Sequence, residues 1–289
     1  MSADKLDPLS IYFEDNLALL ERLEPASFRL IYIDPPFNTG RAQRRKRIRT
    51  VADASGGDRL GFSGRSYRSE VVSQASYQDR FTDFAAFIRP RLEQAHHLLT
   101  DDGALVFHID YREAHYCKVM LDELFGRDAF LNEIIWAYDY GARSKRRWSA
   151  KHDTLFIYVK DPKNYVFNFE AMDRIPYMAP GLVTPEKAKR GKTPTDVWWH
   201  TIVPTNGAER TGYPTQKPLG ILRRLIAVHS EPGDHVLDFF AGSGTTGEAA
   251  LELGRRCTLV DQNPQAIEVM LTRLARYQPV VYGWDAATR

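Results

Sequence analysis

The sequence predicts an α/β fold, in which a doubly wound, mostly parallel sheet carries helices on both faces and a smaller irregular lobe is attached. Three observations predict it. Short apolar runs alternate with segments of helical periodicity, the order that a parallel sheet with helical crossovers requires. The 289 residues are 43% hydrophobic, so the chain can bury one sizeable core. A glycine-rich turn at 241–247 lies between an apolar run and a helical segment, as in nucleotide-binding sheets.

The amino-terminal part supplies three strand–helix units. Its apolar runs are short and end at turn residues, as in strands that are buried on both faces of a sheet. In chain order we expect a strand at 11–15, a helix at 16–23, a strand at 28–37, a helix at 81–99, a strand at 104–110 and a helix that ends near Phe125. Residues 38–76 interrupt this order with five glycines, many Arg and Ser residues and little apolar periodicity. This segment is therefore predicted to be a basic, mobile, functional loop.

The carboxyl-terminal part completes the sheet. In chain order we expect strands at 131–140 and 153–160, a helix at 218–229, a strand at 235–240, a helix at 245–253, a strand at 256–261 and a helix at 264–276. Residues 161–212 are rich in Pro, Lys, Thr and Gly and have weak periodicity. The expected organisation is a main domain formed by 1–160 and 213–289, with a smaller lobe formed by 161–212.

The charges of the chain are clustered, although the net charge is only +2. Residues 41–50 carry six basic side chains, residues 141–151 carry five and residues 187–192 carry four, and none of these segments contains an acid. One such cluster is consistent with a solvated surface. Three of them in a nearly neutral protein favour a polyanionic partner, because Lys and Arg gain affinity by releasing the counterions of phosphates.

Several classes of protein are disfavoured by the sequence. Two cysteines, Cys117 and Cys257, cannot form a disulfide framework, so we expect a reducing, cytoplasmic environment. No apolar run approaches the ~20 residues of a membrane-spanning helix, and the amino terminus lacks the pattern of a secretory signal. The histidines and cysteines show no metal-ligand spacing, so no metal is expected.

The glycine-rich turn indicates a nucleotide cofactor. Gly242, Gly244 and Gly247 match the pattern G-x-G-x-x-G, and Asp261 ends the next strand about 20 residues further on, where an acid can bind ribose hydroxyls. Asp238 lies just before the glycines, and a carboxylate at that position repels a pyrophosphate. It suits S-adenosylmethionine (SAM), which has no phosphate and carries an amino group and a sulfonium. The sequence therefore favours SAM over NAD, while a loop-bracing role for Asp238 stays open.

Residues 33–40, IDPPFNTG, form a second candidate site. Asp34 ends an apolar strand, and two prolines stiffen the chain that follows it. Phe37 is thereby held beside the carboxylate. A planar amino group needs acceptor oxygens for its two hydrogens and an aromatic face for stacking, and this motif offers both. A proline turn with a buried Phe is the structural alternative.

Three motifs in a fixed order are more specific than any one of them. Residues 34–37 (DPPF), 213–218 (YPTQKP) and 240–244 (FAGSG) together resemble the signature motifs of the amino-group DNA methyltransferases. The catalytic motif comes first and the SAM loop last, which is similar to the circularly permuted beta group of that family. The resemblance covers nearly the whole chain. It implies a seven-stranded SAM-dependent sheet, duplex DNA as the substrate and a target base that is flipped into the pocket.

The resemblance also implies roles for single residues. It places the target base against Asp34, Pro35, Pro36 and Phe37, where the family commonly has Tyr instead of Phe. Residues that the family places near SAM are Asp15 at the adenine, Asp261 at the ribose, Thr215, Gln216 and Lys217 at the carboxylate, and Asp34, Asp238, Phe240, Ala241, Gly242, Ser243 and Gly244 around the methionine half. Trp136 and Tyr138 resemble the aromatic motif that closes the other face of the base, and each is equally consistent with core packing.

The favoured function is transfer of a methyl group from SAM to the N6 amino group of adenine, because Asp at the first motif position goes mainly with adenine in the family. Four alternatives stay open. Two concern the substrate: the N4 amino group of cytosine as the target, or RNA in place of DNA. Two concern the class of protein: a catalytically silent DNA-binding subunit, or a dinucleotide-dependent oxidoreductase that shares only the glycine pattern.

The basic clusters are expected to contact DNA. Phosphate contacts are predicted for Arg44, Arg45, Arg47, Arg146 and Arg147. The lobe of 161–212 is expected to recognise the target sequence, with Lys187, Lys189, Arg190 and Lys192 as candidates. The family resemblance leaves a homodimer and a cognate restriction enzyme open as further partners.

Overall fold

The fold is described from a computed structural model. The structure describes residues 7–38, 43–52, 59–60, 66–77, 81–141, 143–204 and 206–285.

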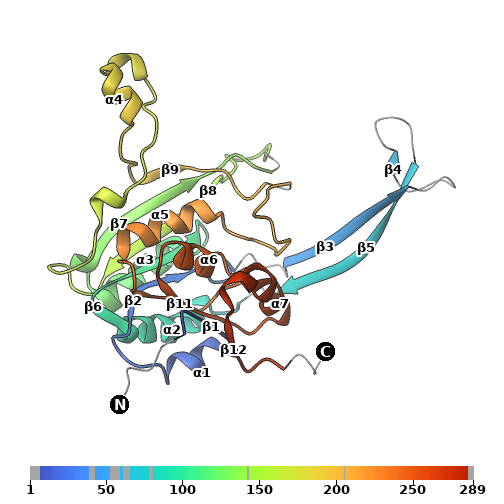
Figure 1. Cartoon of the computed structure of the whole chain (residues 1–289), viewed down its shortest axis with the longest axis horizontal. Coiled ribbons are helices and arrows are strands. Elements are labelled where there is room, and N and C mark those ends of the chain that lie inside the picture. Colours follow the sequence, from blue (N-terminus) through green and yellow to red (C-terminus); the bar gives the residue numbers. More distant parts are fainter. Residues whose placement is uncertain are drawn as a thin grey trace.

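One large sheet forms the centre of the protein (Figure 1). Its strands are β1 (Leu9–Phe13), β2 (Phe28–Ile33), β6 (Leu99–Asp110), β7 (Phe130–Ala137), β8 (His152–Val159), β9 (Val197–Trp199), β10 (His235–Asp238), β11 (Arg256–Asp261) and β12 (Val280–Tyr282). Within the described residues they pair in the order β12-β1-β11-β10-β2-β6-β8-β7-β9. Strand β8 is antiparallel to β6 and to β7, and the other pairings are parallel.

The seven strands that the sequence predicts are all present, and the doubly wound α/β fold is confirmed. Two further strands, β9 and β12, add a three-residue edge on either side of the sheet. They were not predicted because three residues are too few to show an alternating pattern.

Helices cover both faces of the sheet (Figure 1). They are α1 (Asn16–Leu20), α2 (Phe84–Leu98), α3 (Ala114–Phe125), α5 (Leu219–His229), α6 (Thr245–Glu252) and α7 (Pro264–Arg273), while α4 (Pro185–Arg190) lies apart from the sheet. Successive residues of β2 alternate between the faces: Leu30 and Tyr32 pack with α5, α6 and α7, whereas Ile31 and Ile33 pack with α1, α2 and α3. A strand that is buried on both faces reads as a continuous apolar run, which explains why these strands were visible in the sequence.

The connections of two central strands diverge at the carboxyl-terminal edge of the sheet. Strand β10 leads through α6 to β11 on one side, while its neighbour β2 leads through α2 to β6 on the other side. The two helices lie on opposite faces. In doubly wound sheets this divergence leaves a crevice beside the strand ends, and ligands bind there.

The segment that follows β2 is not irregular, contrary to the prediction for 38–76. It contains β3 (Gln43–Ala52), β4 (Arg59–Leu60) and β5 (Ser66–Tyr77), and β3 and β5 form a long antiparallel ribbon that extends away from the body (Figure 1). The backbone groups of β3 and β5 pair with each other, and this pairing requires no apolar periodicity in the sequence. A sequence without apolar periodicity therefore gave no strand signal. Residues 39–42, 53–58 and 61–65 lie outside the described residues.

Residues 161–212 contain little regular structure, as expected. The short elements are α4, β9 and two single-turn 3₁₀ helices, Phe169–Ala171 and Pro180–Leu182. Helix α4 stands on a stalk beyond the β9 edge of the sheet, on a different side of the body from the β3–β5 ribbon (Figure 1). In the described part of the chain, no helix combines the length and the apolar character needed to cross a membrane.

The third glycine of the G-x-G-x-x-G pattern allows close packing of α6 on the sheet. A Cβ atom on Gly247 would lie 2.7 Å from Leu259 Cδ1 and 3.3 Å from Leu274 Cδ1, and both leucines are fully buried. We therefore expect Gly247→Val to lower the free energy of unfolding by about 1–3 kcal/mol, as overpacked cores do. Urea denaturation measures this. Gly181→Val is the control, because a Cβ atom there meets nothing within 4 Å. Equal stability of the two variants would contradict the packing role.

Candidate active site

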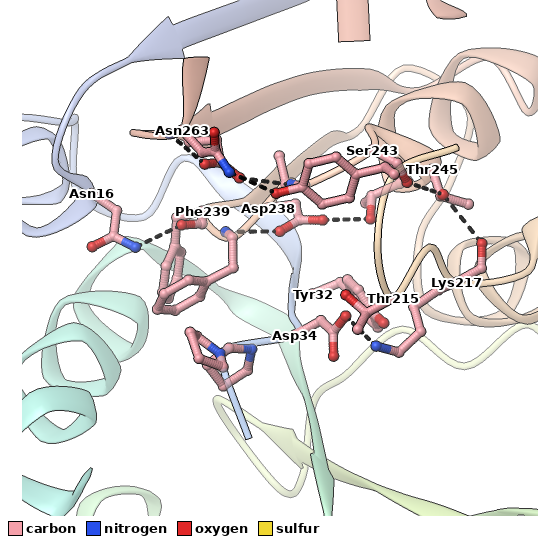
Figure 2. A pocket seen from close by; sticks show the side chains of 18 of the residues that line it. Asn16, Tyr32, Asp34, Thr215, Lys217, Asp238, Phe239, Ser243, Thr245 and Asn263 are labelled. Carbon is pink, nitrogen blue, oxygen red and sulfur yellow. Dashed lines mark hydrogen bonds and ion pairs between the residues drawn. The ribbon is translucent and has the colours of Figure 1, made fainter. Parts of the chain in front are cut away.

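A cavity of about 480 Å³ opens at the carboxyl-terminal edge of the sheet, where β2 and β10 lie side by side. Figure 2 shows side chains from the turn after β10, the end of β2 and the segment before α5 around it. Its walls include Asn16, Asp34, Pro35, Pro36, Phe37, Tyr213, Thr215, Gln216, Lys217, Asp238, Phe240, Ala241, Gly242, Ser243 and Asp261. The three sequence motifs therefore meet in one cavity, although they are far apart in the chain.

The glycine-rich turn brings backbone N–H groups close to the cavity. Gly242 and Gly244 have φ angles of 50° and 72°, in the left-handed region that glycine adopts without strain. A Cβ atom on Gly244 would lie 2.8 Å from Met270 Cγ of α7. Gly244 directly precedes the first residue of α6, and its lack of a side chain allows this turn to lie close to α7. Gly244 itself is not part of the cavity wall.

Asp238 is a buried carboxylate at the end of β10, with 2% exposure. Its Oδ1 accepts a hydrogen bond from the Phe240 N–H at 3.0 Å, and its Oδ2 accepts one from the Thr246 hydroxyl at 2.6 Å. Burial, together with the neighbouring Asp34 and Asp261 carboxylates, raises the pKa of Asp238 to about 7, against the lowering effect of the two hydrogen bonds. A cation beside Asp238 would favour its charged form.

Asp261 ends β11 and braces the glycine-rich turn. Its Oδ2 accepts the Gly242 N–H at 2.8 Å, and its Oδ1 accepts the Asn263 N–H at 2.8 Å. Burial raises the pKa of Asp261 to about 6, while these backbone hydrogen bonds oppose the shift. The carboxylate is thus fixed in the cavity wall with lone pairs left for hydroxyl donors.

The two carboxylate oxygens of Asp34 have different surroundings. Its Oδ2 forms an ion pair with the Lys217 ammonium, 183 positions further along the chain (Figure 2). Its Oδ1 is buried and has no hydrogen-bond partner among the described residues. A buried acceptor without a donor is unfavourable by about 1–3 kcal/mol, so this atom is suited to an N–H group of a ligand.

Phe37 lies beside this carboxylate, as the two prolines predict. The Lys217 Nζ is 4.8 Å from the centroid of the Phe37 ring, within the range of a cation–π contact. Phe37 also packs against the His108 ring at 5.7 Å between centroids. One cation therefore contacts both the carboxylate and the aromatic ring of the DPPF motif.

A buried hydrogen-bond chain behind Asp34 was not predicted. His108, which is fully buried on β6, has Nδ1 at 2.8 Å from the Tyr32 hydroxyl and at 3.7 Å from Asp34 Oδ1. Its Nε2 lies 3.2 Å from Asp153 Oδ2, and Asp153 Oδ1 accepts a hydrogen bond from the Tyr138 hydroxyl at 3.0 Å. Although burial opposes ionisation, hydrogen bonding to His108 and its charge lower the pKa of Asp153. The signal in the sequence was weak: His108 interrupts an apolar run in β6, and Asp153 stands among polar residues at the start of β8.

Several expected cofactor residues have other partners. Gln216 Oε1 accepts hydrogen bonds from the Thr211 backbone and hydroxyl at 2.8 Å, and its Nε2 donates to the Glu209 carbonyl at 2.7 Å, so it braces its own loop. Thr215 lines the cavity with a φ of 57°. Asp15 does not line the cavity: it caps α1 by accepting the Ala18 N–H at 3.2 Å. Its neighbour Asn16 lines the cavity instead and was not predicted.

Two expected stacking aromatics, Trp136 of β7 and Tyr138 directly after it, do not line the cavity. Trp136 is 2% exposed, packs in the core and donates a hydrogen bond from Nε1 to the His200 carbonyl at 2.7 Å. Its ring contacts His108 at 5.6 Å and Tyr138 at 5.3 Å between centroids. Trp136 thus packs between the sheet and the segment that contains His200, and its stacking on a target base stays a prediction. Of the three stacking candidates, Phe37 alone lies in the wall.

The basic residues lie on separate projections. Arg44, Arg45 and Arg47 belong to β3, and their side chains lie outside the described part of the chain. Arg146 and Arg147 are exposed in the loop between β7 and β8, and Lys189 and Arg190 are exposed on α4.

The residues of the cavity fit SAM better than a dinucleotide. Buried Asp238 and the unpartnered Asp34 Oδ1 suit cationic and N–H groups. The same carboxylates in the cavity wall repel phosphates. Residues 7–285, apart from the gaps given above, contain no group of three His, Cys, Asp or Glu side chains that could hold a metal ion.

Comparison with known sequences agrees with this chemistry. The sequence profile of the N6_N4_Mtase family, described as DNA methylase, matches residues 28–272. The chain is 28% identical over 273 residues to the DNA adenine methyltransferase YhdJ of Escherichia coli (strain K12), an alignment that covers 92% of this chain and 82% of YhdJ. It is 28% identical over 255 residues to the type II methyltransferase M.HpaI of Haemophilus parainfluenzae, covering 88% and 70% of the two chains.

Solved structures share the fold. The complex of M1.HpyAVI with SAM matches with a TM-score of 0.58 and 21% identity, covering 92% of this chain and 98% of that one. The cytosine-N4-specific PvuII DNA methyltransferase matches with a TM-score of 0.61 and 16% identity, covering 91% and 85%. Because the family profile spans most of the sequence, the chain belongs to the N6_N4_Mtase family and is a SAM-dependent, amino-group DNA methyltransferase.

Proposed function

We propose that this methyltransferase modifies the N6 amino group of an adenine that is flipped out of duplex DNA, and that the chain has the motif order of the beta group. Two facts support adenine. The first motif residue is Asp34, and the relative YhdJ is named a DNA adenine methyltransferase. The fold neighbour PvuII methyltransferase is named cytosine-N4-specific, so the N4 amino group of cytosine is the second candidate.

The observation that carries the proposal is the unpartnered Oδ1 atom of Asp34. An exocyclic amino group has two N–H donors and a lone pair that is delocalised into the ring. Donation to Asp34 Oδ1, and to a backbone carbonyl of the DPPF turn, would anchor both hydrogens and turn the lone pair toward the methyl donor. Such positioning of reactants can lower a barrier by roughly 7–11 kcal/mol.

The neighbours of Asp34 complete the proposed mechanism. Bound SAM supplies an electrophilic methyl group on its sulfonium. Asp34 is the base nearest to the amino group and accepts the proton that the methylated nitrogen loses. Lys217 holds the Oδ2 side of the Asp34 carboxylate by an ion pair, and the His108–Asp153 pair lies behind it, with His108 Nδ1 at 3.7 Å from Oδ1. Phe37 supplies the stacking face for the base, since of the three candidates it is the one that lines the cavity.

The cofactor is proposed to lie along the ends of β10 and β11. Asp238 faces its positive groups, Asp261 faces the ribose hydroxyls, and Phe240, Ala241, Gly242 and Ser243 form the wall between them. Thr215 and Lys217 are proposed to meet its carboxylate, so Lys217 would be shared between cofactor and Asp34. Gln216 and Gly244 support this loop and turn. Asn16 replaces Asp15 as the wall residue nearest to β1.

DNA is proposed to bind across the same edge of the sheet. The ribbon with Arg44, Arg45 and Arg47 follows directly after the DPPF motif, and the loop with Arg146 and Arg147 connects β7 to β8 at that edge. Residues 161–212, with Lys187, Lys189, Arg190 and Lys192, are proposed as the target-recognition lobe beside the catalytic domain of 1–160 and 213–289.

The first prediction concerns Asp34. Asp34→Asn keeps the shape of the side chain but removes the charge and adds a competing donor, so we expect single-turnover methyl transfer to fall by about 10²–10⁴-fold. Asp34→Ala should be slower still. SAM affinity, measured by calorimetry, should stay within about threefold of that of the natural protein, because the proposed mechanism gives Asp34 no charge-assisted hydrogen bond to the cofactor.

The control for Asp34 is Asp128→Asn, an exposed acid at the opposite edge of the sheet. Mass spectrometry of nucleosides from the methylated duplex identifies the product. N6-methyladenine supports the proposal, and N4-methylcytosine selects the second candidate. Near-normal transfer by Asp34→Ala would remove Asp34 from the mechanism.

The second prediction concerns the pH dependence of SAM binding. The pKa of Asp238 is raised from 3.8 to about 7 in the folded protein. The cofactor's positive charge favours the ionised form, so SAM affinity should rise with pH up to about 7, by at most tenfold per pH unit for one released proton. Titration calorimetry between pH 5.5 and 7.5 measures this slope. Asp238→Asn should bind SAM more weakly and without that slope, and a parallel slope in the variant would contradict the role.

The raised pKa of Asp238 also determines how this group affects the stability of the folded protein. Because its pKa is higher in the folded than in the unfolded chain, Asp238 contributes favourably to the free energy of unfolding below pH 3.8, and this contribution is lost as the pH rises to about 7. Cofactor-free Asp238→Asn should therefore gain stability over the natural protein across this window, by about 4 kcal/mol at most. Thermal unfolding of Asp238→Asn and of the natural protein at pH 5 and pH 8 measures this difference in stability.

The third prediction concerns the ribbon. Replacing Arg44, Arg45 and Arg47 together by Gln should weaken binding to every DNA sequence alike, because phosphate contacts carry no sequence information. The slope of log affinity against log salt should become shallower by up to about 0.9 per contact, or about 2.7 in total. Fluorescence anisotropy at several salt concentrations measures it. Arg127→Gln, an exposed residue at the opposite edge, is the control, and an unchanged slope in the triple variant would show that the cluster is only solvated.

A further inference from the structure

The loop between β7 and β8 is braced by its own polar groups. At its base, the Tyr138 N–H donates to the Lys151 carbonyl at 2.9 Å. Near its tip, the Ser144 N–H donates to Ser149 Oγ at 2.7 Å, and the Arg146 N–H donates to Ser144 Oγ at 3.2 Å. The chain direction at the tip is therefore fixed without a hydrophobic contact.

This braced tip presents a tryptophan to solvent. The Trp148 side chain is 98% exposed, whereas Trp136 and Trp198 are 2% and 6% exposed. A large ring held outside the core on a fixed turn is typical of a binding surface. Its sequence neighbours Arg146 and Arg147 are exposed as well, and neither forms an ion pair with a described residue. The tip thus combines an aromatic ring with unpaired positive charge, which is the combination that nucleic acids bind.

The loop lies at the edge of the sheet that holds the candidate active site. Ala137, the last residue of β7, pairs with His152, the first residue of β8. The next residue inward, Asp153, contacts His108, which in turn lies 3.7 Å from Asp34. The loop and the β3–β5 ribbon leave the sheet on the same side in Figure 1. The base of this loop therefore lies at the sheet edge to which a duplex has to bring a base for Asp34 to meet it.

We propose that Trp148 inserts into the duplex and occupies the stacking space that the flipped base leaves, while Arg146 and Arg147 hold the flanking phosphates. This proposal rests on the proposed function, because it requires a flipped base. An empty position in the stack is unfavourable, and proteins that distort DNA often fill such a gap with an apolar side chain. Trp148 supplies the largest ring for that purpose, and its exposure means that no core contact is lost when it inserts.

The experiment first separates the two proposals. DNA from cells that express the natural protein is sequenced for modified bases, which gives the target base and its sequence without reference to Trp148. A duplex with this site is then made with 2-aminopurine at the target position if the target is adenine, or with pyrrolocytosine if it is cytosine. Both analogues become brighter when they leave the stack. The absence of any modified base would contradict the proposed function itself.

Three variants then test the insertion. Trp148→Ala should lose the rise in analogue fluorescence and slow single-turnover methyl transfer by about 10- to 100-fold, the effect expected for a lost stacking ring. Trp148→Phe should keep most of both signals. Tyr116→Ala, which removes an aromatic ring of 73% exposure from α3, is the control and should behave like the natural protein. SAM affinity and thermal stability should be the same in all of them.

Two outcomes would overturn the proposal. If Trp148→Ala keeps the fluorescence rise and a transfer rate within twofold of the natural protein, the ring does not take part. If it weakens DNA binding but keeps the full fluorescence rise per bound duplex, Trp148 stacks on the outside of the DNA and does not enter it.

Discussion

Three carboxylates, Asp34, Asp238 and Asp261, are held together at the carboxyl-terminal edge of one sheet, and the rest of the site depends on how their mutual repulsion is offset. The raised pKa values of Asp238 and Asp261 follow mainly from burial, and at Asp238 the neighbouring acids add to it. Each carboxylate has its own compensation. Backbone N–H groups of the glycine-rich turn hold Asp238 and Asp261, and Lys217 neutralises Asp34. A positively charged cofactor adds the missing compensation, so cofactor binding and the charge state of the site are linked.

The topology explains why this cluster exists at all. Parallel strands that end at one edge bring their terminal acids together, and the divergence between β2 and β10 leaves room for a ligand between them. Lys217 reaches Asp34 from a segment 183 positions away because that segment precedes α5, which packs across the same strands. The proximity of motif residues is thus a consequence of strand order, and no local feature of either motif specifies it.

Much of this could be predicted from the sequence, for the same reason. Strands buried on both faces appear as apolar runs, so β2, β6, β10 and β11 were visible, and the acids at their ends could be placed at one edge. Other features had no local signal. The sequences of β3 and β5 show no apolar periodicity, and β9 and β12 have three residues each. The contact of His108 with Asp153 depends on the register of β6 against β8. Gln216 was expected to contact the cofactor, and its bonds to Glu209 and Thr211 could not be foreseen because they form only in the folded loop.

The same register connects the chemistry to the DNA-facing segments. The ribbon begins a few residues after Phe37, and the Trp148 loop begins one residue after Tyr138, whose hydroxyl reaches His108 through Asp153. The ribbon and the loop between β7 and β8 therefore start from strand ends that surround Asp34. From Tyr138 the hydrogen bonds run through Asp153 to His108 and Tyr32, and buried networks of this kind hold their geometry because each partner fixes the next. Strand β2, which leads to Asp34, and strand β8, which follows the loop, both pair with β6, so the register of β6 sets the spacing between the two.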